Sequence, residues 1–353
     1  MFLSMLDFLL DMEEHHIYMQ RALQLAKKAL GNTYPNPLVG SVIVSNGKII
    51  GEGWHHKAGE PHAEINAINS VKDKEQLKDS TIYVTLEPCA HHGKTPPCAV
   101  KIVELGIPRV VIGSMDPHDK VNGKGKAILE DAGTEVISGV LEAECDELNK
   151  RFFTYHRKQR PYIILKWAES ADGFMDKDFQ PYAISNALSQ QKNHQLRADE
   201  QAILVGTKTV LNDNPGLTVR KVSGNNPVRI ILDRELKVAV DYKVFNDEAV
   251  TFIINEKKEK AEGNVHWLKA DFGENFLPDL MQVLYKHQIQ SVIIEGGAYT
   301  LNQFIEHDIW DEAWVFKAEN LFLNNGTKAP ELQYEAQTIE QLRDNQLKIY
   351  RNK

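Results

Sequence analysis

The sequence predicts an α/β protein of two domains, and three observations lead to this prediction. Apolar, strand-like runs alternate with segments of helical periodicity along almost the whole chain, which is the pattern of layered α/β folds. The length of 353 residues corresponds to two domains at roughly 150 residues each. A polar, basic stretch at 149–160 divides the alternation into two parts that share no visible repeat.

The first part begins with a predicted amphipathic helix at 13–30, where apolar residues recur at helical spacing and end at Gly31. Asn46-Gly47 joins the apolar runs 38–44 and 48–53 and predicts a two-residue β-hairpin. The elements expected next are a helix from His62, a strand at 81–86, a helix at 97–105 that starts with Pro97, a strand at 109–113, a helix at 124–132 and a strand at 134–138.

The second part restarts the alternation after Pro161. We expect strands at 162–168, 202–205, 228–232, 250–254 and 291–295, with helices at 187–197, at 275–286 and from Ala298. Residues 336–353 are polar and carry no motif, so a strand followed by a tail is expected there. The expected organisation is an extension at 1–12 ahead of Met12, a first domain at 13–150 and a second at 160–353.

Composition excludes several classes of function. The net charge of −8 argues against a general nucleic-acid binder, because neutralising phosphates requires clustered Lys and Arg. No run approaches the ~20 apolar residues that span a bilayer, and the apolar start lacks the basic region of a secretion signal. Three cysteines are too few for a disulfide framework, which favours the reducing cytoplasm.

Two short segments carry residue types that bind metals. One is Pro61-His62-Ala63-Glu64, and the other runs from Glu87-Pro88-Cys89 to Cys98. One His with two Cys thiolates is a ligand set for catalytic zinc, which keeps a fourth position open for water. The metal lowers the pKa of that water toward ~7, and a carboxylate outside the ligand set must then carry the proton. Pro61 places His62 and Glu64 in a first helical turn, so Glu64 is expected to be this carboxylate.

Each half of this pattern also has a simpler explanation. His-x-Glu is common, and intracellular cysteines are more often inert core thiols than ligands. On chemistry alone, rival ligands are His55, His56, His91 and His92. The combination matches the signature of zinc deaminases, except that eight residues separate Cys89 from Cys98 where the template has two.

The longer segments resemble one family. Asn36-Pro37-x-Val39-Gly40, 53–64 and 87–98 resemble the deaminase half of the bifunctional riboflavin biosynthesis deaminase/reductases, over about residues 13–150. The loop Gly93-Lys94-Thr95-Pro96-Pro97-Cys98 is highly specific to that family. The resemblance implies a cytidine-deaminase-like three-layer domain in which Glu64 is the proton shuttle and Zn²⁺ is bound by His62, Cys89 and Cys98. It also suggests that His91, His92 and Lys94 hold the substrate phosphate, the alternative being polar contacts within the loop.

The second half lacks a G-x-G-x-x-G fingerprint after a strand, which argues against a Rossmann domain. Polar or glycine-rich turns follow its strands instead, at 166–173, 206–220 and 294–297. Ligands of open α/β sheets bind at the carboxyl ends of strands, and a helix start with free N–H groups suits a phosphate. Taken singly, each of these turns is weak evidence, since a Gly-Gly pair after a strand is usually only a turn.

As a set, Leu196-Arg197-Ala198, 209–220 and Glu295-Gly296-Gly297 resemble the reductase half of the same family over about residues 160–335. The resemblance implies a dihydrofolate-reductase-like domain with Arg197, Leu217, Arg220 and Glu295 at the substrate. It implies that the NADPH site is lined by Ala168, Thr209, Asp213, Gly297, Ala298, Tyr299, Thr300, Leu301, Asn302 and Gln303. A surface ion pair is the alternative for the two arginines.

The chain departs from the family pattern between Phe174 and Asn186. Ala183-Ile184-Ser185 stands where the family usually has Trp-Ile-Thr, and the preceding loop is short. This puts in question the contact to the cofactor ring that the resemblance implies at this place.

The resemblance therefore implies a riboflavin-pathway enzyme with two activities. The first domain is expected to deaminate 2,5-diamino-6-(5-phosphoribosylamino)pyrimidin-4-one by hydrolysis, and the second to reduce the ribosyl group to ribityl with NADPH. Its partner would be this phosphorylated pyrimidine, with no nucleic acid and no membrane, in a homo-oligomer.

Two alternatives stay open. One is a deaminase of a nucleoside or of tRNA with a reductase-like domain that only binds; acidity argues against tRNA, and the long loop at 89–98 argues against both substrates. The other is a non-catalytic assembly or ligand-binding protein. The complete set of His62, Glu64, Cys89 and Cys98 argues against it for the first domain, whereas the departure near Ala183 leaves it open for the second.

Overall fold

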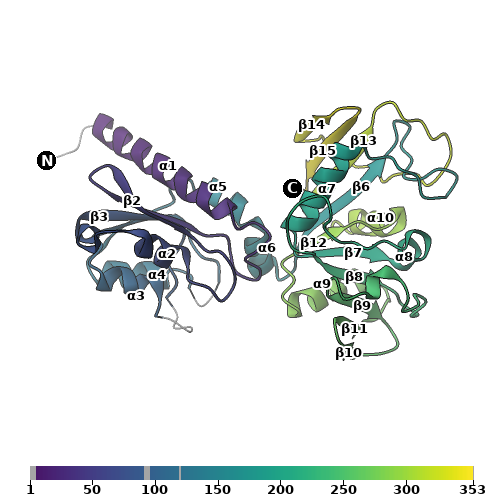
Figure 1. The fold of residues 1–353 in the computed structure, drawn as a ribbon, viewed down its shortest axis with the longest axis horizontal. Coiled ribbons are helices and arrows are strands. Elements are labelled where there is room, and N and C mark those ends of the chain that lie inside the picture. Colours follow the sequence, from purple (N-terminus) through teal and green to yellow (C-terminus); the bar gives the residue numbers. More distant parts are fainter. Residues whose placement is uncertain (1–4, 91–95, 119–120, 353) are drawn as a thin grey trace. The chain divides into compact units, whose positions relative to one another are not determined.

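The computed structural model describes residues 5–90, 96–118 and 121–352, and the chain divides into two compact units, Met1–Lys158 and Gln159–Lys353 (Figure 1). The division falls inside the polar stretch at 149–160. Each unit is built on its own mixed sheet, so the expected α/β class is confirmed for both.

The first sheet has the strand order β2-β1-β3-β4-β5. β1 (Gly40–Ser45) pairs antiparallel with β2 (Lys48–Trp54) and β3 (Ser80–Leu86), whereas β4 (Arg109–Ser114) and β5 (Glu135–Ser138) continue the sheet in parallel. Asn46 and Gly47 both have positive φ, at 50° and 69°, as a two-residue hairpin turn with the twist of the strands requires. The predicted hairpin is therefore confirmed.

Helices cover both faces of this sheet, which makes the three layers that were expected (Figure 1). α1 (Met5–Lys27) and α5 (Glu142–Leu148) lie on one face, where Ala22 and Leu25 pack with Val42, Tyr83 and other strand residues. The opposite face is covered by α2 (Ala63–Ser70), the 3₁₀ turn Lys74–Asp79, α3 (Cys98–Glu104) and α4 (Lys124–Asp131).

Three local predictions need correction in this unit. α1 begins at Met5 rather than at Glu13, because 5–12 contains neither Gly nor Pro and consists mostly of good helix formers. The stretch at 149–160, for which no helix or strand was predicted, is mostly helical: α6 (Lys150–Lys158) fills most of it and buries Phe152 and Phe153. Pro97 is the N-cap of α3 rather than its first residue, so the helix begins at Cys98.

The second unit contains a ten-stranded sheet of order β10-β11-β9-β8-β7-β12-β6-β13-β15-β14. Seven adjacent strands are parallel to one another, namely β11 (Val265–Lys269), β9 (Thr251–Asn255), β8 (Val228–Leu232), β7 (Ala202–Gly206), β12 (Ser291–Ile294), β6 (Tyr162–Glu169) and β13 (Glu312–Ala318). The antiparallel strands β10 (Lys260–Glu262), β15 (Asn345–Arg351) and β14 (Thr338–Leu342) extend its edges.

Helices also cover both faces of the second sheet. α9 (Phe276–Lys286) and α10 (Ala298–Glu306) bury Leu280, Met281 and Phe304 on one face. α7 (Ala187–Asp199) and α8 (Thr207–Asp213) bury Leu196 and Val210 on the other. Six elements were not predicted from the sequence, namely α5, α6, α8, β10, β11 and β13. The expected strand and tail at 336–353 form the hairpin β14–β15.

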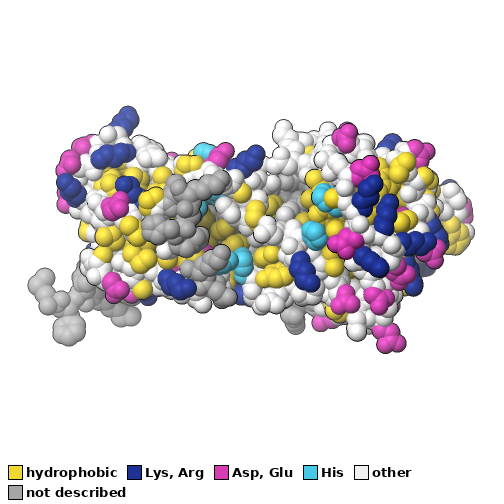
Figure 2. All heavy atoms as spheres, turned by 90° about the horizontal axis from the view of Figure 1, so that it is seen from below, with side chains coloured by type: hydrophobic (Ala, Val, Ile, Leu, Met, Phe, Trp, Pro, Cys, Tyr) yellow, Lys and Arg dark blue, Asp and Glu magenta, His cyan; other side chains and the backbone are white. Residues whose placement is uncertain are grey.

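The face of the molecule shown in Figure 2 carries charges of both signs, with Lys and Arg side chains lying among those of Asp and Glu. Within the described residues, no helix combines the length and the apolar character needed to cross a membrane.

Glycines allow the helices of the first unit to pack backbone against strand. A Cβ on Gly40 would lie 2.0 Å from the carbonyl oxygen of Ala22 in α1, and one on Gly53 would lie 2.3 Å from the main-chain nitrogen of Ala67 in α2. Neither approach leaves room for a methyl group. Both helices are therefore seated on the hairpin at distances that only glycine allows.

We expect Gly40→Ala to lower the free energy of unfolding of the first unit by about 3 kcal/mol, because overpacking forces α1 away from β1. Gly47→Ala is the matched control: its Cβ would meet nothing within 4 Å, and only the positive φ costs about 1 kcal/mol. Urea unfolding measures both variants, and hydrogen exchange at β1 assigns the loss to this unit. Equal destabilisation by the two substitutions would contradict the close packing.

Candidate active sites

Three chain segments bring the predicted zinc ligands together. His62 is the N-cap of α2 and has extended backbone. The rotation that separates two residues i and i+2 inside a helix therefore does not apply to His62 and Glu64. Cys89 follows β3, and Cys98 is the first residue of α3. The Nδ1 atom of His62 lies 3.5 Å from Cys89 Sγ and 3.4 Å from Cys98 Sγ.

This geometry suits a metal ion. The three donor atoms all lie within 4.8 Å of one another, and one imidazole with two thiolates is a set that zinc prefers. Hydrogen bonds from the Cys98 side chain, then from His62 and from the Cys98 main-chain N–H at 3.3 Å, outweigh burial and lower the pKa of Cys89 to about 4. The pKa of Cys98 is raised, mainly by its bond to Cys89 and by burial. These surroundings favour the thiolate form of Cys89, which is the form that binds metals.

Glu64 lies beside this cluster, as expected, and is almost completely buried at 3% exposure. Burial raises the pKa of its carboxyl to about 7, although the neighbouring His62 acts in the opposite direction. A carboxyl group with a pKa near the working pH can both take up and release a proton, which is what general acid–base catalysis requires.

Two of the rival histidines, His55 and His56, do not belong to this donor cluster. His55 is buried and has other contacts: its Nε2 lies 3.0 Å from Asn36 Nδ2, and its Nδ1 lies 3.1 Å from the Pro61 carbonyl oxygen. His56 packs against the Trp54 ring. The predicted phosphate-holding residues His91, His92 and Lys94 lie outside the described residues.

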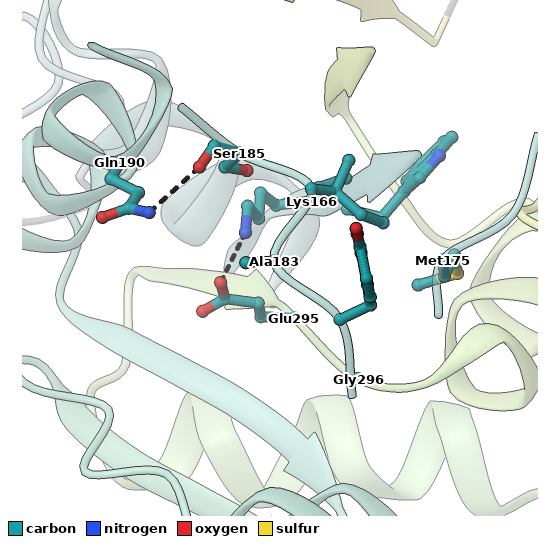
Figure 3. A pocket seen from close by; sticks show the side chains of 11 residues that line it. Lys166, Met175, Ala183, Ser185, Gln190, Glu295 and Gly296 are labelled. Atoms are coloured by element: carbon teal, nitrogen blue, oxygen red, sulfur yellow. Dashed lines mark hydrogen bonds and ion pairs between the residues drawn. The ribbon is translucent and has the colours of Figure 1, made fainter. Parts of the chain in front are cut away.

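The second candidate site lies at the carboxyl edge of the parallel strands of the second unit, where a cleft of about 290 Å³ opens. Figure 3 shows Lys166 from β6 pointing toward Glu295, which follows β12. The Lys166 ammonium donates to Glu295 Oε1 at 2.6 Å, and the Arg197 guanidinium of α7 donates to Oε2 at 2.7 Å. Asn193, one turn before Arg197, donates to Oε1 at 3.2 Å.

Glu295 is therefore a largely buried anion between two cations. Burial by itself would raise its pKa, but Arg197 and Lys166 outweigh burial and hold the pKa at about 2. Arg197 thus takes part in an ion pair, as the alternative proposed, but a largely buried one whose acidic partner, Glu295, lines the cleft. Lys166 was not predicted as a site residue. The signal that could have identified it is a lysine within an apolar strand, directly after Ile163-Ile164-Leu165.

The other two predicted substrate residues lie on the segment after α8. Arg220 is exposed; its guanidinium donates to Thr218 Oγ1 at 2.8 Å, and its main-chain N–H donates to His194 Nδ1 at 3.2 Å. Leu217 has a φ of 52° and a side chain buried in the core. Positive φ in a branched residue is strained backbone, which tends to occur at functional sites.

The structure gathers part of the predicted cofactor set at the same edge. Thr209 in α8 accepts a hydrogen bond of 3.2 Å from the N–H of Gly297, the N-cap of α10. Thr300 lies next to Gly296 and Gly206, and Ala168 lines the cleft. Asp213 ends α8, and burial raises its pKa.

The remaining predicted cofactor residues belong to α10 and differ in exposure. Ala298 and Asn302 are half-buried and Tyr299 is exposed, whereas Gln303 donates to Glu306 within the helix. Leu301 is completely buried in the core, and its main-chain N–H donates to the Gly297 carbonyl oxygen at 3.2 Å, so this residue presents no surface to a ligand.

Residues 182–185, where the chain departs from the family pattern, form one wall of the cleft. Gln190 of α7 donates to the carbonyl oxygen of Ser185 at 3.0 Å and holds this wall in place (Figure 3). The wall presents Tyr182 and Ala183 where the family's Trp was expected, so any ring contact there must come from different side chains.

Comparison with known proteins divides the chain in the same way. Residues 12–114 match the family profile described as the cytidine and deoxycytidylate deaminase zinc-binding region, and residues 161–322 match the RibD C-terminal domain. Among solved structures, the deaminase/reductase of Thermotoga maritima superimposes with a TM-score of 0.88 at 37% identity, covering 97% of this chain and 100% of that one. The RibD structure of Acinetobacter baumannii (form 2) gives 0.85 at 31% identity, covering 96% and 99%.

Curated relatives agree along most of both chains. The riboflavin biosynthesis protein RibD of Aquifex aeolicus is 45% identical over 311 residues, which is 86% of each chain. The Escherichia coli RibD protein is 35% identical over 322 residues, covering 86% of this chain and 87% of that protein. The chain therefore belongs to the RibD family, the bifunctional deaminase/reductases of riboflavin biosynthesis.

Proposed function

We propose that a first domain at 13–150 deaminates 2,5-diamino-6-(5-phosphoribosylamino)pyrimidin-4-one and that a second at 160–353 reduces the ribosyl group of the product with NADPH. The convergence of His62, Cys89 and Cys98 beside the buried Glu64 is the observation that carries the proposal. The Thermotoga relative, described as a diaminohydroxyphosphoribosylaminopyrimidine deaminase and 5-amino-6-(5-phosphoribosylamino)uracil reductase, supports the choice of substrate.

In the first domain, His62, Cys89 and Cys98 would hold zinc. When bound, zinc supplies the Lewis acidity that activates water at neutral pH. Glu64 takes the proton from the attacking water and delivers it to the ring nitrogen, and a further proton passes through Glu64 to the amino group, which leaves as ammonia. Burial of Glu64 suits this role, because it raises the pKa of the carboxyl to about 7.

In the second domain, bound NADPH would supply a hydride to the ribosyl C1. The bond from C1 to the ring oxygen breaks, and that oxygen takes up a proton to become a hydroxyl group of the ribityl chain. Glu295 stays ionised between Lys166 and Arg197 and presents fixed acceptor oxygens to the substrate. Arg220 keeps an exposed guanidinium that can form charge-assisted hydrogen bonds to the substrate phosphate. A deaminase of nucleosides or tRNA with a merely binding second domain is less well supported, because relatives match across both units.

The metal is tested first. We expect about one zinc per chain, since three protein ligands and a water complete a tetrahedral site. Cys89→Ser should lose both the zinc and deamination. Cys145→Ser is the control, because this buried thiol packs on Gly113 outside the donor cluster. Metal analysis of both purified variants decides; equal zinc in Cys89→Ser and wild type would refute the ligand set.

The two activities are tested by separating them. Glu64→Gln keeps the size of the side chain but cannot carry a proton, so deamination should fall by about 100-fold or more. Supplied with the deaminated substrate, this variant should still consume NADPH at the wild-type rate. Arg220→Ala should do the opposite, with deamination kept and reduction lost at low substrate concentration.

In this experiment, ammonia release follows deamination and the loss of NADPH absorbance follows reduction. Mass spectrometry identifies the products formed with and without NADPH. Loss of both activities in Glu64→Gln with deaminated substrate present would refute two separate sites. Absence of any product from the wild-type chain would refute the proposed substrate.

The predicted NADPH site at the start of α10 is tested by substituting the adjacent residues Gly296 and Gly297. A Cβ on Gly297 would lie 3.6 Å from Thr209 Oγ1, an ordinary contact, so Gly297→Val should fold but should weaken NADPH binding by about tenfold or more, which is about 1.4 kcal/mol. A Cβ on Gly296 would lie 2.9 Å from Thr300 Cβ, so Gly296→Val should also lower the melting temperature. Fluorescence titration with NADPH measures the affinity. An unchanged affinity in folded Gly297→Val would contradict the placement.

A further inference from the structure

Glu87 is a buried carboxylate next to the predicted zinc ligands that the proposed reaction does not use. It follows β3 and precedes Pro88-Cys89, and it is 4% exposed. Its main-chain N–H donates to the Ser114 carbonyl oxygen at 2.9 Å and so extends the pairing of β3 with β4. A buried carboxylate is costly unless its oxygens accept hydrogen bonds, so its partners show what it stabilises.

Its partners are three main-chain N–H groups of the segment that follows β4. Glu87 Oε2 accepts from Gly123 at 3.0 Å and from Asp116 at 3.3 Å, and Oε1 accepts from Lys126 at 3.1 Å. Gly123 is the N-cap of α4 and has no side chain to cap that helix. Glu87 therefore caps α4 from another part of the chain and places a negative charge at its amino end.

A steric contact joins α4 to the turn that carries Cys89. A Cβ on Gly125, in the first turn of α4, would lie 1.9 Å from the Pro88 carbonyl oxygen, so helix and turn meet backbone to backbone. The other side of the turn meets α3, where Ala99 N–H donates to the Cys89 carbonyl oxygen at 3.3 Å. The Cys89 turn thus lies between the amino ends of α3 and α4, and on the α4 side the Glu87 carboxylate accepts the hydrogen bonds.

We propose that Glu87 is a positioning residue of the zinc centre: it docks α4 on the Pro88-Cys89 turn and thereby fixes the Cys89 sulfur relative to His62 and Cys98. The same carboxylate accepts a hydrogen bond from the main-chain N–H of Asp116, whose side chain is buried. This inference rests on the proposed zinc ligands. Groups that orient metal ligands from outside the ligand set affect metal affinity or activity by about 10–100-fold when they are replaced.

The test uses Glu87→Gln in the zinc-loaded full chain. An amide presents only one acceptor oxygen, and its NH₂ group must face a main-chain N–H in either orientation. Val110→Ala is the matched control, because it removes buried volume from β4 in the same unit without touching the turn. Two measurements report on the centre: the rate of zinc transfer to an excess of a chromogenic chelator, and the thiolate-to-metal absorption bands of the Co²⁺-substituted protein.

We expect Glu87→Gln to release zinc about tenfold faster or more and to shift the Co²⁺ bands, with a fall in deamination kcat at a nearly unchanged KM. Val110→Ala should lower the melting temperature but leave zinc release and the bands as in the wild type. Wild-type zinc release and bands in folded Glu87→Gln would overturn the proposal and leave Glu87 a purely structural cap.

Glu87→Asp serves if Glu87→Gln does not fold, because it keeps both oxygens and draws them back by one methylene. It should release zinc faster than the wild type, and a wild-type release rate would overturn the proposal. Absence of zinc from the wild-type chain would instead refute the ligand set, so the two failures are distinguishable.

Discussion

Parallel strand pairing is the constraint on which both sites depend. When neighbouring strands run in the same direction, their carboxyl ends lie at one edge of the sheet, and the loops that follow them meet there. In the first unit, the turn with Cys89 follows β3 and the segment with Asp116 follows β4, its parallel neighbour. In the second unit, β6, β12 and β7 are adjacent and parallel, which places Lys166, Glu295 and the start of α8 at one edge.

Two glutamates show how surroundings decide the role of one residue type. Glu64 is buried and Glu295 is largely buried, but burial dominates at Glu64 and raises its pKa to about 7, whereas Lys166 and Arg197 dominate at Glu295 and hold its pKa at about 2. The first carboxyl is suited to exchange a proton at neutral pH, and the surroundings of the second favour its ionised form. The proposed division between proton transfer and substrate positioning follows from this difference.

Main-chain contacts set the precision of the site in the first unit. Gly40, Gly53 and Gly125 each let a helix approach another segment to a distance that a Cβ would block. A side-chain contact can adjust by changing rotamer, but a backbone contact between regular elements has little freedom. Close packing of this kind fixes the positions of His62 and Glu64 at the start of α2 and of the start of α4 next to the Pro88-Cys89 turn. Fixed positions suit a centre whose ligand atoms must lie within a few ångströms of one another.

The sequence by itself determined the α/β class, the hairpin at Asn46-Gly47, most strands and helices, and the metal-ligating types His62, Cys89 and Cys98. These follow from local periodicity, turn chemistry and residue type, which are written in short windows of the chain. Tertiary structure decided what depends on distant segments. α6 is helical because Phe152 and Phe153 pack into a hydrophobic cluster. Lys166 belongs to a site because Glu295 lies opposite it. Glu87 has a role only because main-chain N–H groups of Asp116, Gly123 and Lys126 donate to its carboxylate. Local sequence patterns do not encode such contacts between distant segments, because the contacts depend on strand order and on the faces that helices bury.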